Sequence, residues 1–337
     1  VPGIILHSSS AINLSNINIY MVGAMALIGE NTENVTLKQF NVKLREGSGR
    51  YISASADATH FVNCRGTIRL DDCIFENMLD DATNVHGTYM IVNEFLSDDC
   101  IALQFGHLQQ EGFSFASIGD TLQLVDRTSL LPVSRFVVKE VNIINDDYWI
   151  IHSERPLLSV DKSMHLAVEN ITNTASLVMQ RCTVKNNRAR SILISTPKPV
   201  LIEDNYFDSM MAGILIAGDA NSWFESGYVT DVVIRNNTFV NMGKGGEAPQ
   251  SVLQISPEIP KSERSKGYYH GKIVFENNLI KTFDSQVIYA LSVNELIIKN
   301  NKFVETNDYK PIFEGLSFID VQNCNNVAIE GNSFEGN

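Results

Sequence analysis

Short runs of apolar residues recur along the chain in one arrangement. Two or three apolar residues are followed by two mostly polar residues, then by a residue at a fixed offset, and then by an apolar residue two positions later. Alternation of this kind over a few residues predicts short β-strands with one buried side. The fixed-offset position is held by Cys73, Cys182, Asn205, Asn237, Asn278, Asn301 and Asn332.

The intervals between these copies predict the fold. The interval from Cys182 to Asn205 equals that from Asn278 to Asn301, and the other intervals among the later copies are longer. A basic period of about 23 residues with loops of variable length is what one coil of three short strands requires, because successive coils then stack about 4.8 Å apart. Asn at a repeated corner tolerates a left-handed turn and can hydrogen-bond along the stack. The chain is therefore predicted to be an all-β, right-handed parallel β-helix, in preference to a sandwich of unrelated strands.

One interval departs from this period. Cys73 and Cys182 are more than four basic periods apart, although they are consecutive copies of the repeat. The intervening sequence loses the repeat and alternates like antiparallel strands instead, with turn signals such as Gly119 between them. The strand-like segments are 120–125, 134–141 and 148–152.

This interval divides the chain into three predicted parts. Residues 1–87 and 173–337 are expected to form the helix, and 88–172 an inserted small antiparallel β-barrel. A long irregular loop is the weaker alternative, since loops of that length are uncommon. On this alignment Cys73 and Cys182 should lie on neighbouring coils.

Composition and charge narrow the function classes. Hydrophobic residues make up 44% of the chain and charged residues 19%, as in a globular protein. The formal charge of −13 disfavours nucleic acid and acidic polymers as ligands, because like charges repel. The sequence has no apolar run of about 18 residues, as a membrane-spanning helix needs. Its five cysteines include no C-x-x-C pair, so buried free thiols are expected rather than a disulfide framework or a zinc site.

Three aspartates are the strongest candidates for catalysis. Asp57 and Asp80 are one basic period apart, so we expect them to stack on one face, with Asp81 beside them. An ordinary coil does not need acids there, since a later coil has Ala212 and Gly213 at the equivalent positions. Crowded carboxyls push one another's pKa values apart. Glycoside cleavage needs two carboxyls with different pKa values, because one acid must stay protonated for the leaving oxygen while an ionised one activates water.

The same cluster predicts a stereochemical course. A water held between acid and base calls for carboxyls roughly 6.5–9.5 Å apart and inverts the anomeric carbon. Diagonal positions on adjacent coils can reach that separation. An exposed acidic strip or a calcium site remains an alternative interpretation of the three acids.

Two arginines are expected next to the acids. When the insertion is removed, Ala189 and Arg190 align with Asp80 and Asp81, so Arg188 and Arg190 should lie one coil further on. Arginine at that place can orient a carboxylate or bind sugar hydroxyls. A surface salt bridge is the alternative for either residue.

Other candidates for substrate binding lie in loops and beside the acids. Trp223 and Glu225 combine a ring for the face of a sugar with a carboxylate for its hydroxyls. His86 is a further candidate and His60 a weaker one, since either could merely cap a turn. Trp149 is expected in the core of the insertion.

The segment 79–87, Leu-Asp-Asp-Ala-Thr-Asn-Val-His-Gly, set in a β-helix, resembles glycoside hydrolase family 110. This is the family of exo-acting α-1,3-galactosidases of gut and marine bacteria, and the resemblance covers most of the chain, including the barrel insertion. It implies inverting removal of terminal α-1,3-linked galactose, as on blood group B structures, without a metal or other cofactor. The chain is more distantly similar to polygalacturonases, which share one Asp followed about a coil later by an Asp-Asp pair. That likeness implies that Asp80 is the acid and that Asp57 and Asp81 together hold the water.

Departures from these families leave other classes open. The Gly-His-Gly and Arg-Ile-Lys elements of polygalacturonases are absent, which disfavours a uronate substrate. Val1 begins within a repeat without the family's usual capping helix, so coils that precede it in full-length members are expected to be missing. A pectin-type hydrolase or lyase should have a basic cleft, and a non-catalytic glycan-binding module would lack the acid trio. No signal peptide is visible, and a glycan substrate leads us to expect a secreted bacterial protein, in the periplasm or outside the cell.

Overall fold

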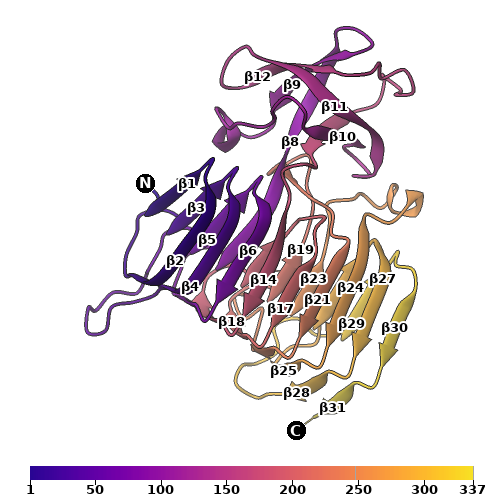
Figure 1. Cartoon of the computed structure of the whole chain (residues 1–337). Coiled ribbons are helices and arrows are strands. Elements are labelled where there is room, and N and C mark those ends of the chain that lie inside the picture. The colour runs from indigo at the N-terminus through magenta and orange to yellow at the C-terminus, as the bar shows by residue number, and fades with distance from the viewer. Residues whose placement is uncertain (247, 337) are drawn as a thin grey trace.

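The computed structural model describes residues 1–246 and 248–336. Glu247 and Asn337, which fall in the last predicted segment of the helix, lie outside the described residues. The chain winds into stacked coils that run from the indigo N-terminus to the yellow C-terminus in Figure 1, and successive coils pair in parallel. The predicted parallel β-helix with an inserted antiparallel barrel is confirmed.

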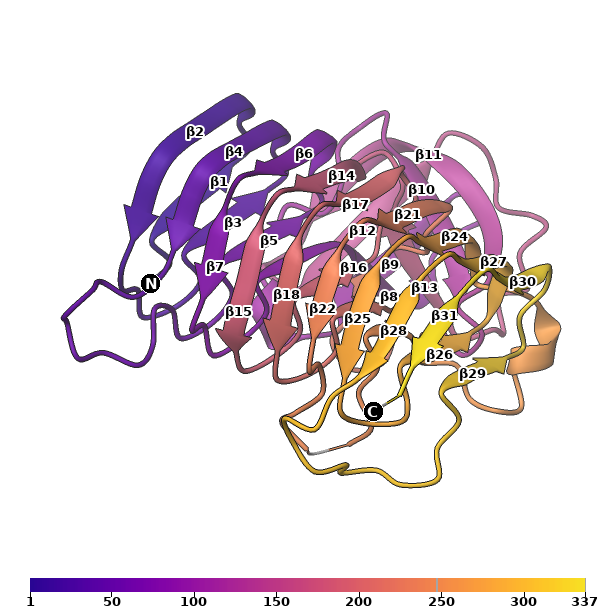
Figure 2. The same cartoon turned by 90° about the horizontal axis from the view of Figure 1, so that it is seen from below.

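The later coils contribute a strand to each of three faces, whereas in the first two coils one long strand runs from the second face onto the third. The first face consists of β1 (Ile4–His7), β3 (Leu27–Glu30), β5 (Thr59–Val62), β8 (Thr83–Phe95), β16 (Ile192–Ile194), β19 (Ile214–Ile216), β23 (Leu253–Ile255), β26 (Ile288–Leu291) and β29 (Ile319–Gln322). The second consists of β2 (Ser10–Ile19), β4 (Glu33–Val42), β6 (Arg65–Asp71), β14 (Ala175–Gln180), β17 (Val200–Glu203), β21 (Asp231–Arg235), β24 (His270–Glu276), β27 (Val293–Lys299) and β30 (Val327–Glu330). The third, whose strands lie side by side in Figure 2, consists of β7 (Ile74–Glu76), β15 (Thr183–Asn187), β18 (Tyr206–Ser209), β22 (Thr238–Val240), β25 (Leu279–Thr282), β28 (Lys302–Glu305) and β31 (Ser333–Glu335).

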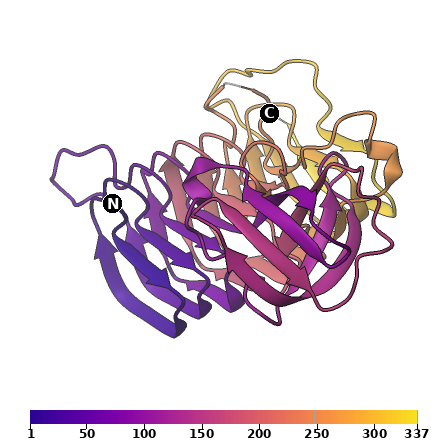
Figure 3. The ribbon, with the colours of Figure 1, turned by 90° about the horizontal axis from the view of Figure 1, so that it is seen from above.

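The insertion is a closed antiparallel barrel that shares β8 with the helix. The first residues of β8 pair in parallel with β5 and β16, whereas its later residues pair antiparallel with strands of the insertion. Going round the barrel, each strand pairs with the next and the last returns to β8. The order is β8, β9 (Cys100–Phe105), β12 (Tyr148–Ser153), β11 (Pro132–Ile143), β10 (Thr121–Asp126) and β13 (Leu166–Asn170). Seen from above, the barrel covers part of the helix (Figure 3).

Three short elements complete the secondary structure. They are β20 (Glu225–Ser226), which pairs antiparallel with β8, and two 3₁₀ turns, η1 (Leu108–Gln110) and η2 (Arg264–Lys266). Within the described part of the chain, no helix has the length and apolar character needed to cross a bilayer.

The strands form where apolar residues alternate with residues that face outward. In β21, Val232 and Ile234 are fully buried, whereas Val233 between them is partly exposed. Equivalent inward residues stack from coil to coil, and the rings of Phe207 and Phe239 lie 5.0 Å apart. Burial of one such side chain contributes roughly 1.5–3 kcal/mol, and the same column continues through the stack. The insertion has its own core, in which Trp149 is buried as expected.

The predicted asparagine ladder is present at one corner of the helix. The Oδ1 atom of Asn237 accepts hydrogen bonds from the backbone N–H and the side-chain amide of Asn205, at 3.0 and 2.9 Å. The Oδ1 atom of Asn278 accepts the same two hydrogen bonds from Asn237, and the ladder continues in this way through Asn301 to Asn332. The left-handed conformation falls one residue before the ladder position, with a φ of 56° at Asn236. The ladder residue itself bonds along the stack, and Asn237 also donates to the carbonyl of Arg235 in its own coil.

Cysteine replaces asparagine at the ladder positions that flank the insertion. The backbone N–H of Cys73 points to the Sγ atom of Cys182 at 3.4 Å, and Thr183 pairs with Ile74. Cys73 and Cys182 therefore lie on neighbouring coils, as the repeat alignment predicts. Both cysteines are buried and unpaired.

Removal of a ladder amide should destabilise the helix. Asn237→Ala leaves the donors of Asn205 and the acceptors above and below it unpaired in the core, at roughly 1–3 kcal/mol for each stranded group. The exposed pair in which Asn325 donates to Asn294 offers a matched control, since Asn325→Ala removes an amide contact that water replaces. Chemical denaturation should show a clear loss of stability for Asn237→Ala and little change for Asn325→Ala. Equal stability of the two variants would contradict a stabilising role for the ladder.

Candidate active site

The candidate site lies on the outer side of the first face, where β5 and β8 run next to each other. Because side chains alternate along a strand, Thr59 and Phe61 point into the core and His60 points outward. In β8, Asn84 and His86 take the outward positions, and His60 pairs with Asn84. The loops that precede these two strands carry Asp57 and the Asp80–Asp81 pair. A parallel stack therefore brings residues about one coil apart in sequence to one place.

The three aspartates meet at this place. One carboxylate oxygen from each of Asp57, Asp80 and Asp81 lies within 4.8 Å of the others. The Oδ1 atom of Asp57 accepts a hydrogen bond from the backbone N–H of Asp81 at 3.1 Å. Asp57 and Asp81 are buried, and Asp80 is partly exposed. The sequence prediction that these acids cluster is thus reproduced in the geometry.

One detail of the prediction needs correction. Thr59 pairs with Thr83, a step slightly longer than the basic period, so Asp57 stands next to Asp81 rather than directly below Asp80. The difference arises because the basic period is that of the asparagine corner, and the loop between the faces is longer here. The expected carboxyl separation of roughly 6.5–9.5 Å stays a prediction, because the limit of 4.8 Å applies to one oxygen of each acid and not to the carboxyl groups as a whole. Their spacing therefore does not by itself distinguish inversion from retention.

Arg190 is the cation nearest the acids. Its guanidinium donates to Oδ2 of Asp81 at 2.7 Å, and its backbone N–H donates to Oδ1 of the same residue at 2.8 Å. Ile192 pairs with Thr83, which places Arg190 beside Asp81 as the alignment predicts. Arg188 is exposed, and its side chain donates to the backbone carbonyl of Leu79 at 2.7 Å. Arg190 thus holds an acid, whereas Arg188 lies at the edge of the cluster.

Burial and mutual repulsion keep protons in the cluster. Burial raises the pKa of Asp81 to about 8, opposed by the charge of Arg190 and supported by those of Asp57 and Asp80. Burial and the charge of Asp57 also raise the pKa of Asp80, although both arginines oppose this shift. Both oxygens of Asp81 already accept hydrogen bonds from Arg190. Asp80, which is partly exposed, is therefore the acid better placed to reach a ligand.

Two histidines and an acid from a distant loop complete the cluster. The Nδ1 atom of His60 lies 2.8 Å from Oδ2 of Asp57, and its Nε2 atom lies 2.8 Å from Nε2 of His86. Glu225 on β20 accepts a hydrogen bond from the side chain of Asn84 at 3.3 Å and lies 3.7 Å from Nε2 of His86. The pairing of β20 with β8 brings Glu225 here, and it requires a glycine at position 87, where a Cβ would lie 2.4 Å from Oγ of Ser226.

Trp223 lies at the rim of the site rather than among the acids. Its side chain is 56% exposed and packs against the ring of His107, with 5.0 Å between the centroids. His107 follows β9, so the insertion supplies half of this aromatic pair. Trp223 lies at the edge of the site and Glu225, two residues later, lies beside Asn84 and His86. These positions are compatible with the prediction that both residues contact one glycan.

Sequence reasoning underrates three of these residues. Of the two histidines considered from the sequence, His60 is rated the weaker candidate. Asn84 and His107 are not singled out from the sequence at all. His60 and Asn84 could have been found from strand alternation combined with the coil register, which together give the outward positions beside the acids. His107 carries no such signal, because only the fold of the insertion brings it to Trp223.

Among the described residues, the acid cluster is the group that could hold a cation. Three carboxylates within 4.8 Å resemble the oxygen donors that hard cations prefer. However, both oxygens of Asp81 are already hydrogen-bonded by Arg190, and Asp57 is hydrogen-bonded to His60. Internal partners thus take up part of the donor set, and the metal-free site predicted from the sequence stays a prediction.

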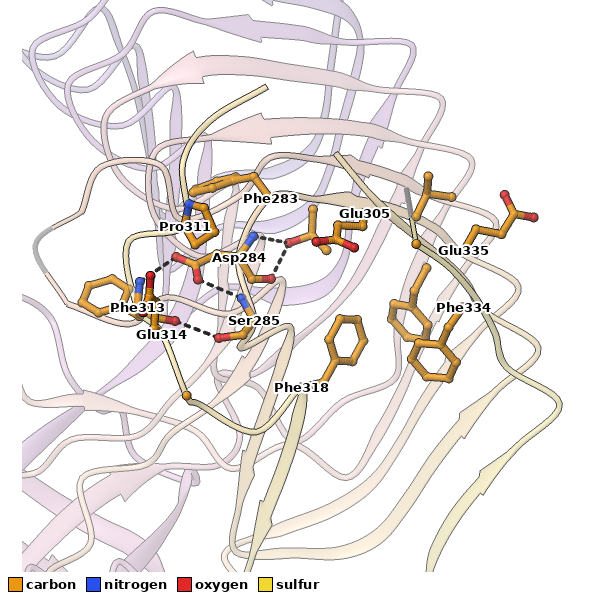
Figure 4. A pocket seen from close by; sticks show the side chains of 15 residues that line it. Phe283, Asp284, Ser285, Glu305, Pro311, Phe313, Glu314, Phe318, Phe334 and Glu335 are labelled. Atoms are coloured by element: carbon orange, nitrogen blue, oxygen red, sulfur yellow. Dashed lines mark hydrogen bonds between the residues drawn. The ribbon is translucent and has the colours of Figure 1, made fainter. Parts of the chain in front are cut away.

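A separate cavity near the C-terminal coils does not contribute to this site. It has a volume of about 450 Å³ and is lined by aromatic side chains that include Phe303, Phe318 and Phe334. Figure 4 shows one of its acids, Asp284, bonded to neighbouring backbone, and the Oδ2 atom accepts from the N–H groups of Ile312 and Phe313 at 2.9 and 3.1 Å. Asp284 therefore anchors a loop, and the acids of the candidate site lie elsewhere in the molecule.

Comparisons with known proteins agree with the fold and the insertion. Residues 166–337 match a family described as "Right handed beta helix region". The chain belongs to this right-handed β-helix family. Residues 100–160 of the β-helix protein match a second family, described as "GLAA-B beta-barrel domain II". The predicted handedness is thereby confirmed. The tailspike of Pseudomonas phage phi297 has a TM-score of 0.23 and 11% identity, over 84% of this chain and 66% of that one, and a likeness this slight adds nothing.

Curated relatives extend the similarity to nearly the whole chain. Alpha-1,3-galactosidase B of Phocaeicola vulgatus is 35% identical over 99% of this chain and 58% of its own length. Alpha-1,3-galactosidase B of Akkermansia muciniphila is 35% identical over 98% of this chain and 42% of its own length. Alpha-1,3-galactosidase A of Bacteroides fragilis is 33% identical over 99% and 55%. The chain thus resembles α-1,3-galactosidases, as expected from the sequence, and spans about half the length of these relatives.

Loss of the Arg190 guanidinium should change how stability depends on pH. The folded-state pKa of Asp81 exceeds the ordinary value of 3.8, so its contribution to stability is complete below pH 3.8 and is lost as the pH rises through about 8. Arg190→Gln removes the charge that opposes this shift, so the loss should extend to higher pH. We expect the difference in stability between Arg190→Gln and the wild type to stay constant from about pH 5 to 7 and to widen above pH 8, where Asp81 ionises in the wild type.

Thermal unfolding from pH 5 to 9.5 measures this effect. Arg188→Gln is the matched control, because Arg188 is exposed and donates to a backbone carbonyl rather than to Asp81, and its curve should parallel that of the wild type above pH 8. If the curves of Arg190→Gln and the wild type run parallel above pH 8, the coupling between Arg190 and Asp81 is not as described.

Proposed function

We propose that this chain is the catalytic core of an exo-acting glycoside hydrolase that removes terminal α-1,3-linked galactose from glycans, as on blood group B-like structures. Its similarity to α-1,3-galactosidases over nearly all of its residues supports this substrate. The observation that carries the proposal is the cluster of three carboxyls beside one arginine on an outer face of the helix. A structural coil has no need of such a cluster, because burial of repelling acids destabilises the fold.

The three acids divide the chemistry of hydrolysis in this proposal. Asp80 donates its proton to the glycosidic oxygen, since its pKa is raised and its side chain is partly exposed. Asp57 and Asp81 hold the attacking water between them. Arg190 fixes the orientation of Asp81 through two hydrogen bonds.

Substrate contacts surround this centre. We assign Glu225 and Arg188 to the sugar hydroxyls, because both lie beside the acids and can form charge-assisted hydrogen bonds. Trp223, half exposed at the rim, offers a ring face for a sugar further along the glycan. The ring nitrogens of His86 both have protein partners, so its contribution is to the floor of the site.

Inversion is the stereochemical course that we propose. The resemblance to family 110 supports it, and two acids that share one water fit a single displacement better than a lone nucleophile. The close approach of the carboxylate oxygens is compatible with a retaining pair as well, for which the separation is roughly 5–5.5 Å. The anomer of the first product is therefore the deciding observation.

The location of the enzyme follows from its substrate in this proposal. Glycans with terminal galactose are displayed outside cells, so we place the protein in the periplasm or outside a bacterial cell. The relatives named above are bacterial. Fractionation of the native host with an antibody against residues 1–337 would test this placement.

Asp80→Asn should abolish turnover of natural substrates and spare part of the activity on activated ones. An aryl galactoside with a good leaving group needs little protonation, so the loss there should be smaller by a factor of about 10²–10⁴, the usual contribution of general acid catalysis. Asp57→Asn and Asp81→Asn should lose activity on both substrate types, because each impairs activation of the water. Steady-state kinetics on both substrates compares the three variants. An equal loss for Asp80→Asn on both would show that another residue is the acid.

The first product from a branched α-1,3-galactosyl oligosaccharide should be β-galactose. Single displacement inverts the α-linkage, and ¹H NMR in the first minutes records the anomer before mutarotation mixes the two forms. Release of α-galactose would refute the inverting course and leave the substrate assignment intact. Unsaturated products would indicate a lyase, and binding of the oligosaccharide without cleavage would indicate a glycan-binding module.

A further inference from the structure

A continuous hydrogen-bonded chain runs beneath the acids and ends on the backbone. It starts at Oδ2 of Asp57, passes through both ring nitrogens of His60, and reaches Nε2 of His86. The Nδ1 atom of His86 then lies 2.6 Å from the carbonyl oxygen of Gly87. Both rings are nearly enclosed, with side-chain exposures of 12% for His60 and 6% for His86. The two rings meet edge to face, with centroids 4.8 Å apart.

The number of protons in this chain can be counted from its end groups. The Gly87 carbonyl can only accept, so Nδ1 of His86 must carry a proton. The contact between the two Nε2 atoms needs one further proton, and so does the contact between Asp57 and Nδ1 of His60. Three protons on an ionised carboxylate and two imidazoles are one more than the neutral rings hold. Asp57, His60 and His86 therefore hold one proton more than an ionised carboxylate with two neutral imidazoles, and together they have no net charge.

Surrounding charges favour the histidines as the place for that proton. Burial lowers the pKa of His60, but the hydrogen bond to Asp57 and the charges of Asp57, Glu225 and Asp81 outweigh this and raise it above its ordinary value. Burial and the charge of His60 lower the pKa of His86, although Glu225 opposes them. Glu169 lines the small enclosed pocket next to His86, and burial raises its pKa to about 7. The charged groups that face the pair are thus acids, and Arg190 is turned to Asp81.

We propose that His60 and His86 share a single proton and act as one cationic pair, which keeps Asp57 ionised as the base among three crowded acids. His60 and His86 are then positioning residues that act through Asp57 and do not touch the substrate. This role rests on the proposed function, since only a reaction that needs a base gives the pair a purpose in turnover. The charge state of the pair, in contrast, is a property of the resting protein and can be measured without substrate.

¹⁵N NMR of histidine-labelled protein measures that charge state directly. Protonated and bare ring nitrogens have distinct chemical shifts, and the variants His60→Asn and His86→Asn assign the signals among the seven histidines. At pH 7 the rings of His60 and His86 should together hold three protons and release one of them in a single step at higher pH. His270 is the internal control, because it is equally buried and lacks an acidic partner, and it should stay neutral throughout.

Kinetics of the same variants test the link to Asp57. Asparagine retains a donor close to the Nδ1 position but has no charge, so His60→Asn should lose kcat by about 10- to 100-fold, the scale of one charge-assisted hydrogen bond. The double variant Asp57→Asn/His60→Asn should be no slower than Asp57→Asn alone, because the pair acts only through Asp57. His152→Asn, which removes a histidine of the barrel strand β12, is the matched control and should keep wild-type kcat.

The outcomes separate this inference from the proposed function. Two neutral rings at pH 7, or independent titration of two charged rings, would overturn the shared proton. Additive losses in the double variant would overturn the positioning role. A shared proton in a protein that releases no galactose would support the charge state and remove the proposed function instead.

Discussion

Parallel pairing between successive coils is the constraint from which the rest of the structure follows. Every coil must return to the hydrogen-bonding register of the coil before it, whatever loop it carries on the way. The apolar columns and the asparagine ladder stabilise that register, since a slip of one residue would turn buried side chains outward and strand the buried amides. The register also has a chemical consequence, because residues about one coil apart in sequence become neighbours in space. Asp57 and Asp81 meet for this reason.

The insertion is compatible with this constraint because it begins and ends within one coil. β8 starts as a helix strand and continues as a barrel strand, so the barrel is attached through an uninterrupted backbone rather than through a flexible linker. The return through β13 brings the chain back to β14, which pairs with β6 as if nothing had been inserted. The barrel thereby gains a fixed position next to the acids, and it places His107 against Trp223 at the rim of the site.

Two of the three acids in the site each have a basic partner beside them. Arg190 pairs with Asp81, and the two histidines face Asp57, which leaves Asp80 as the carboxyl without a cationic partner of its own. Such an arrangement lets three acids occupy a small volume without all three being protonated. It also gives each acid a different environment, which is the physical requirement for separate acid and base functions. The overall charge of −13 plays no part in this, since the balance is reached within a few ångströms.

The sequence by itself determined the repeat, and with it the β-helix, the position of the insertion and the three acids. It could do so because the apolar columns and the asparagine corner impose a periodic pattern that is legible along the chain, and because Arg190 aligns with Asp81 by simple counting. It did not determine the longer step from Thr59 to Thr83 at the first face, because that depends on how a loop between two faces is wound. Nor did it reveal the chain from Asp57 through His60 to His86, or the approach of Glu225 to Asn84. Those contacts join separate coils and a distant loop through side-chain directions, which are decided only when the tertiary structure packs them together.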